Sequence, residues 1–375
     1  MKNLKVFISL LLVLSLFISV VACSQPAPTP APTPAPAPAP TPSPAPAVEP
    51  IVLSLAPMSL APPPAKSLTE YFANMVKLIE TRTNGRVKIE VYWAQTLAPQ
   101  NQVVSATSTG VADIGAVIPE QEAGKLPLSR VGGLPGFGSD FWAQSMAFWE
   151  LMNQEPLLSE FTQYNLLPFS LDFLSDFHMI SVAPINSVAE MKGKKISTSG
   201  LASETVAALG GVPIAMTPVE QYESLQKGMI DASVAPYGAF ESFKFYEVAK
   251  YIEQFPFGGK VQPVLINMNS WNKISPDDQK TIKSLIPEFI QFNIDAFYAK
   301  DQPLFPLTQQ IVNDSKIQII SASEADVAAI NMVQTGQAEK WAADQDKAGL
   351  PGTNILADYR ALIEKYSKIS TFPYK

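Results

Sequence analysis

The stretch LGGVPIAMTPVEQYESLQKGMIDA, residues 209–232, contains a strand, a helix and the start of a second strand. Apolar residues near 213–216 favour a short strand, and the pattern over 219–227 predicts a helix. Gly228 and Asp231 follow the helix as the turn into a strand over 230–234. This strand–helix–strand order is the repeating unit of an α/β protein with a mostly parallel sheet.

The same order extends on both sides of this stretch. Upstream, a strand over 194–198 and a helix over 203–209 precede it, and an earlier part of the chain repeats the alternation over 51–117. Two further strands, LLPFSLDF at 166–173 and FHMISVAP at 177–184, are separated by Ser175 and Asp176. Because about 325 folded residues are too many for one core, we expect two α/β lobes with a crossing near Ser175.

The C-terminal third reads mainly as helix. The sequences YIEQFPF and QPVLINM, at 251–257 and 262–268, predict strands. A long helical region is then expected over 276–314, which prolines at 287, 303 and 306 should kink or break. Helices follow to the C-terminus, with one more strand over 316–320.

The N-terminus carries the pattern of a bacterial lipoprotein signal. Lys2 and Lys5 precede an apolar run over 6–21, and the junction VVAC resembles a lipobox in which Cys23 is lipidated. An uncleaved anchor with an incidental cysteine is the alternative. Residues 24–50 are rich in Pro, Ala and Thr and predict a polyproline II spacer of roughly 3 Å per residue. We therefore expect a signal peptide over 1–22, a lipid-linked spacer over 23–50 and a folded part over 51–375.

Composition argues against several functions. The formal charge of −7 is scattered, which disfavours nucleic-acid binding. One histidine and one cysteine provide neither a zinc site nor a Cys–His pair, and the chain lacks the G-x-S-x-G and Walker motifs. The acidic pair Asp277-Asp278 falls at a helix start, where capping explains it. We expect no enzyme and no cofactor, with a carboxylate-dependent hydrolase as a minor alternative.

Seven stretches, taken in order, resemble the extracytoplasmic solute receptors of TRAP transporters. They are TNGRVKIEVYWAQTL, GVADIGA, LPGF, MKGKKI, LGGVPIAMTPVEQYESLQKGMIDA, FYEVAKYI and INMNSWNKISPDDQ, and they extend to about residue 290. The resemblance implies an α/β, two-lobed binding-protein fold that closes on a ligand in the cleft between its lobes, with a long helix along both lobes. It places about 51–174 and 263–302 in lobe I, and about 175–262 and 303–375 in lobe II.

Several residues that bind the ligand in this family are replaced here. The family carries an arginine two residues after the lysine of its GxKI strand, and this chain has Ser197 there. The asparagine expected before Pro236 is Ala235, and the aromatic residue expected two positions before Glu220 is Pro218. Because lysine or serine cannot copy the bidentate pair that arginine makes with a carboxylate, we expect a less charged ligand or an anion held elsewhere.

Other residues are candidates to complete the ligand site. A second basic residue of the family aligns with His178, the only histidine, which we expect to titrate near neutral pH. Thr198 and Tyr237 are candidate replacement donors, and Phe173 is a candidate pocket wall. A structural role in the core or at the lobe edge is the alternative for each of these residues.

The resemblance implies a membrane-tethered receptor outside the cytoplasm of a bacterium. Its partners would be a small organic solute, the membrane subunits of a TRAP transporter and the lipid bilayer through Cys23, with no nucleic acid. A binding lipoprotein of an ABC importer or of a sensor system is the alternative.

Overall fold

The computed structural model describes residues 49–57, 66–122, 124–174, 176–198, 200–297 and 309–372. Residues 48–375 form one compact unit of the chain. Cys23, residues 24–48 of the proline-rich spacer, and Pro303 and Pro306 lie outside the described residues. Within the described ranges, no helix is both long enough and apolar enough to cross a membrane.

The first lobe is built on a five-stranded sheet with the order β2-β1-β3-β10-β4. Its strands are β1 (Ile51–Ala56), β2 (Val87–Val91), β3 (Ile114–Ala116), β4 (Leu166–Leu174) and β10 (Lys260–Asn267). Its helices are α1 (Lys66–Arg82), η1 (Gln100–Gln102), α2 (Val103–Thr109), η2 (Ser129–Gly133), α3 (Phe141–Met152), α4 (Leu157–Thr162), α9 (Met268–Trp271), α10 (Pro276–Ser284) and α11 (Ile286–Phe297).

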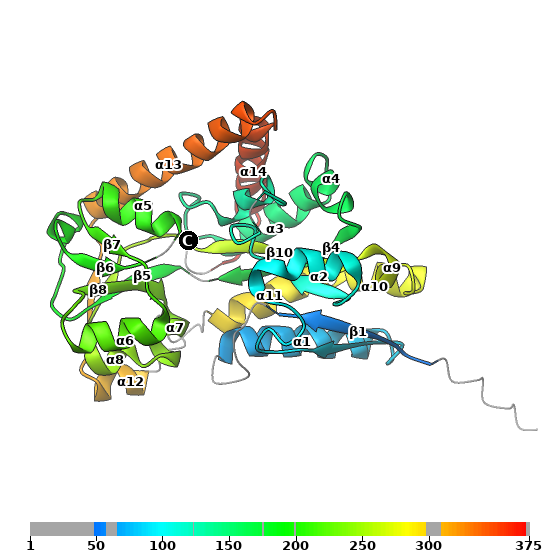
Figure 1. The fold of residues 1–375 in the computed structure, drawn as a ribbon, viewed down its shortest axis with the longest axis horizontal. Coiled ribbons are helices and arrows are strands. Elements are labelled where there is room, and N and C mark those ends of the chain that lie inside the picture. The colour runs from blue at the N-terminus through cyan, green and yellow to red at the C-terminus, as the bar shows by residue number, and fades with distance from the viewer. Residues whose placement is uncertain are drawn as a thin grey trace, which may run out of the picture. The chain divides into compact units, whose positions relative to one another are not determined.

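The second lobe is built on a six-stranded sheet with the order β11-β9-β5-β8-β6-β7. Its strands are β5 (Phe177–Ser181), β6 (Lys195–Ser197), β7 (Val212–Ile214), β8 (Ala232–Pro236), β9 (Tyr251–Gln254) and β11 (Gln318–Ser321). Its helices are η3 (Val188–Met191), α5 (Leu201–Ala208), α6 (Pro218–Gln226), α7 (Tyr237–Ser242), α8 (Phe245–Val248) and α12 (Gln309–Asp314). The predicted pair of α/β lobes is confirmed (Figure 1).

Both sheets are mixed, because a strand that follows a crossing runs against its neighbours. β10 is antiparallel to β3 and β4, and β5 is antiparallel to β8 and β9. The remaining pairs, including β1 with β2 and β6 with β8, are parallel as the alternating sequence predicted. The chain passes from the first sheet to the second between β4 and β5, beside Asp176.

Local contacts explain the strand–helix–strand unit at 209–232. Thr217 caps α6 by accepting a hydrogen bond from the Glu220 backbone N–H, and the Glu220 carboxylate accepts one from the Thr217 N–H at 2.8 Å. This capping box is a strong helix start signal. At the other end of the unit, the Asp231 carboxylate accepts a hydrogen bond from the Lys195 N–H at 2.7 Å, which ties β6 to β8. Glu220 and Asp231 therefore have structural roles.

The helical region over 276–314 is divided beside Pro287, as its prolines predicted, since α10 ends at Ser284 and α11 extends from Ile286 to Phe297. Two other expectations about the C-terminal part need correction. The helix that contacts both lobes is instead α13 (Glu324–Lys347), which packs on α5 and on α14 (Gly352–Ser367) (Figure 1). α14 packs on α3, so this part of 303–375 joins the first lobe, whereas α12 and β11 join the second.

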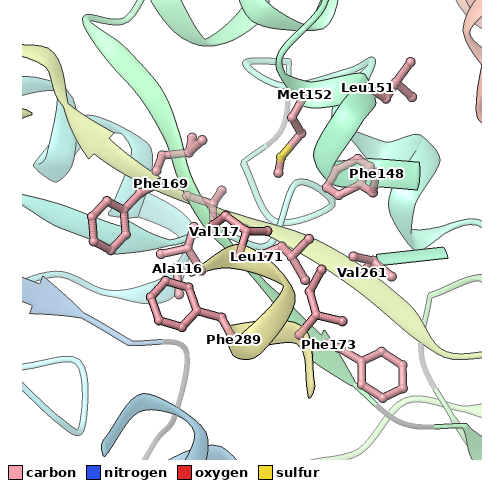
Figure 2. Packing of buried hydrophobic residues seen from close by; sticks show 14 of the residues in the cluster. Ala116, Val117, Phe148, Leu151, Met152, Phe169, Leu171, Phe173, Val261 and Phe289 are labelled. Atoms are coloured by element: carbon pink, nitrogen blue, oxygen red, sulfur yellow. The ribbon is translucent and has the colours of Figure 1, made fainter. Parts of the chain in front are cut away.

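The larger hydrophobic core belongs to the first lobe. Figure 2 shows side chains from β3, β4, β10, α3 and α11 meeting in this cluster. Phe173 is completely buried there and packs on Phe141, with ring centroids 4.5 Å apart. Phe173 therefore stabilises the first lobe from the inside, a placement that differs from the pocket wall expected from the sequence.

Candidate solute-binding site

Three of the predicted site residues lie at one edge and on one face of the second sheet. His178 is directly opposite Ala235 in the β5–β8 pairing, and Ser197 is directly opposite Ser233 in the β6–β8 pairing. Directly paired residues share a face, and so do residues two apart on a strand, such as Ser233 and Ala235. The register therefore brings Ser197, Ala235 and His178 together where β6 and β8 end and β5 begins.

Two buried hydroxyls at this edge have no hydrogen-bond partner among the described residues. They belong to Ser197, which is 0% exposed, and to Thr198, which is 3% exposed. Ser233, on the neighbouring strand, contrasts with them because its hydroxyl donates to Gln221 Oε1 at 2.9 Å. A buried polar group without a partner costs roughly 1–3 kcal/mol, which a hydrogen bond to a bound ligand, ion or water would offset.

His178 presents a neutral ring at the same edge. Its Nδ1–H donates to the carbonyl oxygen of Phe255 at 3.3 Å, and its ring stacks on Tyr237. Burial lowers the pKa of His178 to about 4, although the carbonyl of Phe255 opposes this shift. The expected titration near neutral pH is therefore corrected, since the imidazole is uncharged above about pH 5.

Tyr237 is the first residue of α7 and is 6% exposed. Its hydroxyl accepts a hydrogen bond from Gln254 Nε2 at 3.3 Å, and burial raises the pKa of the phenol above its usual range. The charge of Asp176, beside the lobe crossing, also raises the pKa of this phenol. Burial in turn raises the pKa of the Asp176 carboxyl to about 7. Tyr237 thus lies in the predicted site, with its hydroxyl engaged by the second lobe.

Pro218 and Phe173 are not part of this group. Pro218 begins α6, and its side chain lies outside the described residues. Phe173 lies in the first lobe's core. Two residues beside the site were not identified from the sequence. Gln221 was predicted only as a helical residue, one turn into α6. Asp176 was predicted only as a residue at the crossing between the lobes.

A second missed feature is an ion pair at the first lobe's side of the crossing. Lys260 Nζ lies 3.1 Å from Glu120 Oε1, and both side chains are largely buried. Lys260 also borders a small pocket of about 20 Å³, which Gly133 and Pro135 line from the first lobe and Leu201 and Ala202 line from the second. No sequence motif marks Lys260, because it precedes an apolar strand as many lysines do.

The side chains able to ligate metals are dispersed over the described residues. Among them, no three His, Cys, Asp or Glu side chains group as metal ligands. At the start of α10, Asp278 has a structural role, since it accepts from Ser275 Oγ and lies 2.6 Å from Arg86. Its backbone N–H donates to the Ser275 hydroxyl, which caps the helix.

Comparison with known proteins finds solved structures with the same fold and a family that matches the chain. A relative from Nostoc, named monocarboxylate 2-oxoacid-binding periplasmic protein all3028, is 26% identical over 57% of this chain and 60% of its own length, which is under two thirds. A TRAP periplasmic solute-binding protein from Desulfovibrio salexigens superposes with a TM-score of 0.75 at 25% identity, over 86% of this chain and 99% of that one.

A TRAP solute-binding protein from Rhodoferax ferrireducens, solved with copurified benzoate, superposes with a TM-score of 0.72 at 22% identity, over 85% of this chain and 99% of that one. Residues 58–344 match the family described as bacterial extracellular solute-binding protein, family 7 (DctP). These proteins bind solutes and are not enzymes. The chain therefore belongs to the family 7 bacterial extracellular solute-binding proteins, in agreement with the TRAP receptor resemblance.

Proposed function

We propose that this protein is a membrane-tethered receptor that binds a small organic acid and delivers it to the membrane subunits of a TRAP-type importer. The observation that carries the proposal is the pair of buried, unpartnered hydroxyls of Ser197 and Thr198 at the edge where the family places its ligand. Solute binding between the lobes would supply their missing partners and favour lobe closure.

The residues at the site favour a monocarboxylate with a flat or apolar body. The stacked rings of His178 and Tyr237 offer an uncharged aromatic surface, and Ala235 adds an apolar contact. Without the family's arginine at position 197, a dicarboxylate would bring a second charge with no matching guanidinium. The benzoate in the Rhodoferax relative and the 2-oxoacid named for the Nostoc relative support this ligand class.

Membrane tethering is part of the same proposal and rests on the sequence at Cys23. Lipid on this cysteine and an extended spacer would hold the receptor near the membrane subunits. Fractionation of cells expressing the full chain and Cys23→Ser tests this. We expect the wild-type protein with the membranes and the variant in the soluble extracytoplasmic fraction; equal fractionation of both would contradict tethering.

Isothermal calorimetry on the full chain in detergent tests the ligand class. The panel is benzoate, mandelate and pyruvate, with succinate as the dicarboxylate and benzamide as the uncharged analogue of benzoate. We expect at least one monocarboxylate to bind more tightly than succinate. Preferred binding of succinate, or no binding of any acid at millimolar concentration, would contradict the proposal.

A further inference from the structure

The second lobe's site edge lacks the positive charge that an acid needs. Ser197, Thr198, Ala235 and Tyr237 are uncharged, and His178 is neutral above about pH 5 because burial lowers its pKa. A carboxylate that leaves water without a cation or several donors pays a desolvation cost of several kcal/mol. The charge must therefore come from another element.

Lys260 is a cation that reaches toward the second lobe from the start of β10. An ideal Cβ built on Gly200 would lie 3.9 Å from Lys260 Nζ, so the ammonium lies beside the residue that precedes α5. Gly200 follows Ser197 and Thr198 by only two to three residues. Lys260 also lines the pocket that both lobes share with Leu201 and Ala202. The lysine of the first lobe is thus placed next to the loop that carries the unpartnered hydroxyls.

Glu120 pairs with this ammonium, and both Glu120 and Lys260 can form further hydrogen bonds. Glu120 Oε1 lies 3.1 Å from Lys260 Nζ, whereas Glu120 Oε2 is buried and has no hydrogen-bond partner in the described part of the chain. Lysine carries three donors, so Nζ retains capacity for a second acceptor. The exposures of the two side chains, 23% and 21%, place the pair away from bulk water, where its attraction is stronger than at the surface.

The backbone around Glu120 is shaped for this carboxylate. A Cβ on Gly133, at the end of η2, would lie only 2.4 Å from Glu120 Oε1. Glycine at this position therefore gives the carboxylate the room to approach the chain and to face Lys260. The backbone of the first lobe therefore accommodates the ion pair between Glu120 and Lys260.

We propose that Lys260 is the residue that holds the carboxylate of the solute, in place of the arginine that is absent at position 197. Glu120 positions the ammonium while the site is empty, and the solute's carboxylate becomes a second acceptor for the same ammonium when the lobes close. The inference deepens the proposed function and rests on it. Because lysine acts as a point charge without the fork of arginine, the contact selects for charge more than for carboxylate geometry.

Arg130 is the competing cation, and the test must separate it from Lys260. The other arginines, Arg82, Arg86 and Arg360, each pair with a carboxylate. Among the described residues, Arg130 has no such partner, and its buried Nε has no acceptor. It lies in η2 three residues before Gly133, and residues so spaced in a 3-10 helix share a face.

The experiment measures binding of benzoate, mandelate and pyruvate, and of benzamide, to the full chain by calorimetry. The variants are Lys260→Gln, Lys260→Arg, Glu120→Gln and Arg130→Gln. Lys250→Gln is the matched control, because the Lys250 side chain is also partly exposed but its Nζ donates to the carbonyl of Tyr246 in α8 at 2.7 Å, just before β9 in the second lobe. The double variant Glu120→Gln, Lys260→Gln removes both charges of the pair, so that neither charge stays buried without its partner. It therefore controls for folding.

We expect Lys260→Gln to weaken acid binding about tenfold or more, while Lys260→Arg retains it and benzamide binding does not change. Glu120→Gln should strengthen acid binding, because it removes a competing negative charge. Unchanged acid binding in Lys260→Gln, or a selective loss in Arg130→Gln, would overturn the assignment and leave the proposed function intact. If none of the acids binds the wild-type protein, the proposed function fails as well.

Discussion

The ring of His178 stacks on the ring of Tyr237, with centroids 4.5 Å apart and planes inclined by 21°. The two residues come from β5 and from the helix that follows β8, and the pairing of those strands sets them side by side. Because burial lowers the pKa of His178 to about 4, the imidazole acts as a flat uncharged surface in the neutral range. In this role it differs from the basic residue found at the matching position in the family.

Replacing His178 should therefore affect solute binding through the loss of its flat ring, and not through the loss of a charge. His178→Ala should weaken benzoate binding several-fold, because stacked aromatic pairs contribute about 0.5–1.5 kcal/mol. His178→Phe should preserve most of the affinity and show the same pH dependence as the wild type between pH 5 and 8. A wild-type affinity change centred near pH 6.5 that disappears in His178→Phe would show that the imidazole titrates in the site. Calorimetry with benzoate at several pH values measures both effects.

Ser197→Ala should make the protein more stable and a poorer receptor. Its hydroxyl is buried without a partner, so removal should raise the free energy of unfolding by roughly 1 kcal/mol. Ser181→Ala is the matched control, because the Ser181 hydroxyl lies 2.6 Å from both Ala183 O and Glu253 Oε1 and its loss should lower stability. Urea unfolding and benzoate titration of the same samples decide the matter. A Ser197→Ala protein that binds normally would indicate that the hydroxyl has no solute role.

The sequence predicted the lobes well because local signals recur along it. The recurring order of strands and helices marked β1, β2 and β6, and the turn at Gly228 marked the end of α6. The lobe on which each C-terminal helix packs was less predictable. α14 joins the first lobe through long-range contacts with α3, and no periodicity within 352–367 specifies which surface covers its apolar face.

The site was predictable in part, for a similar reason. The resemblance to TRAP receptors gave Ser197, His178 and Ala235 as candidates, and the strand register brings them together in the structure. Lys260 was missed since its importance depends on proximity to Glu120 and Gly200, which are far away in sequence. The pKa of His178 was also misjudged, because burial is a property of the folded chain.

Glu253 should make stability depend on pH. This β9 residue is completely buried, and burial raises the pKa of its carboxyl from 4.5 to about 7, against hydrogen bonds from Ser181 and Ile185. The folded state therefore keeps a proton that the unfolded state loses above pH 4.5. Its contribution to stability is full below that pH and is lost as the pH rises to about 7.

The variant Glu253→Gln removes this titration. Relative to it, the wild type should lose about 1 kcal/mol of unfolding free energy per pH unit between pH 5 and 7, and little more above that range. Glu223→Gln is the control, because Glu223 is exposed and pairs with Lys227. Urea unfolding at each pH provides the free energies. Parallel curves for wild type and Glu253→Gln would show that the carboxyl titrates normally.

The contact between α13 and α5 should contribute to stability through Gln337. Its Nε2 donates to the Leu201 carbonyl at 3.0 Å, and its Oε1 accepts from Thr205 Oγ1 at 3.3 Å. Gln337→Met keeps the volume and removes both bonds, so it should lower the free energy of unfolding by roughly 1–2 kcal/mol. Combining it with Thr205→Val should cost less than the sum of the single changes, because the two side chains share one bond. Additive losses in a urea-unfolding cycle would show that the bond between Thr205 and Gln337 contributes nothing to the joint between the two helices.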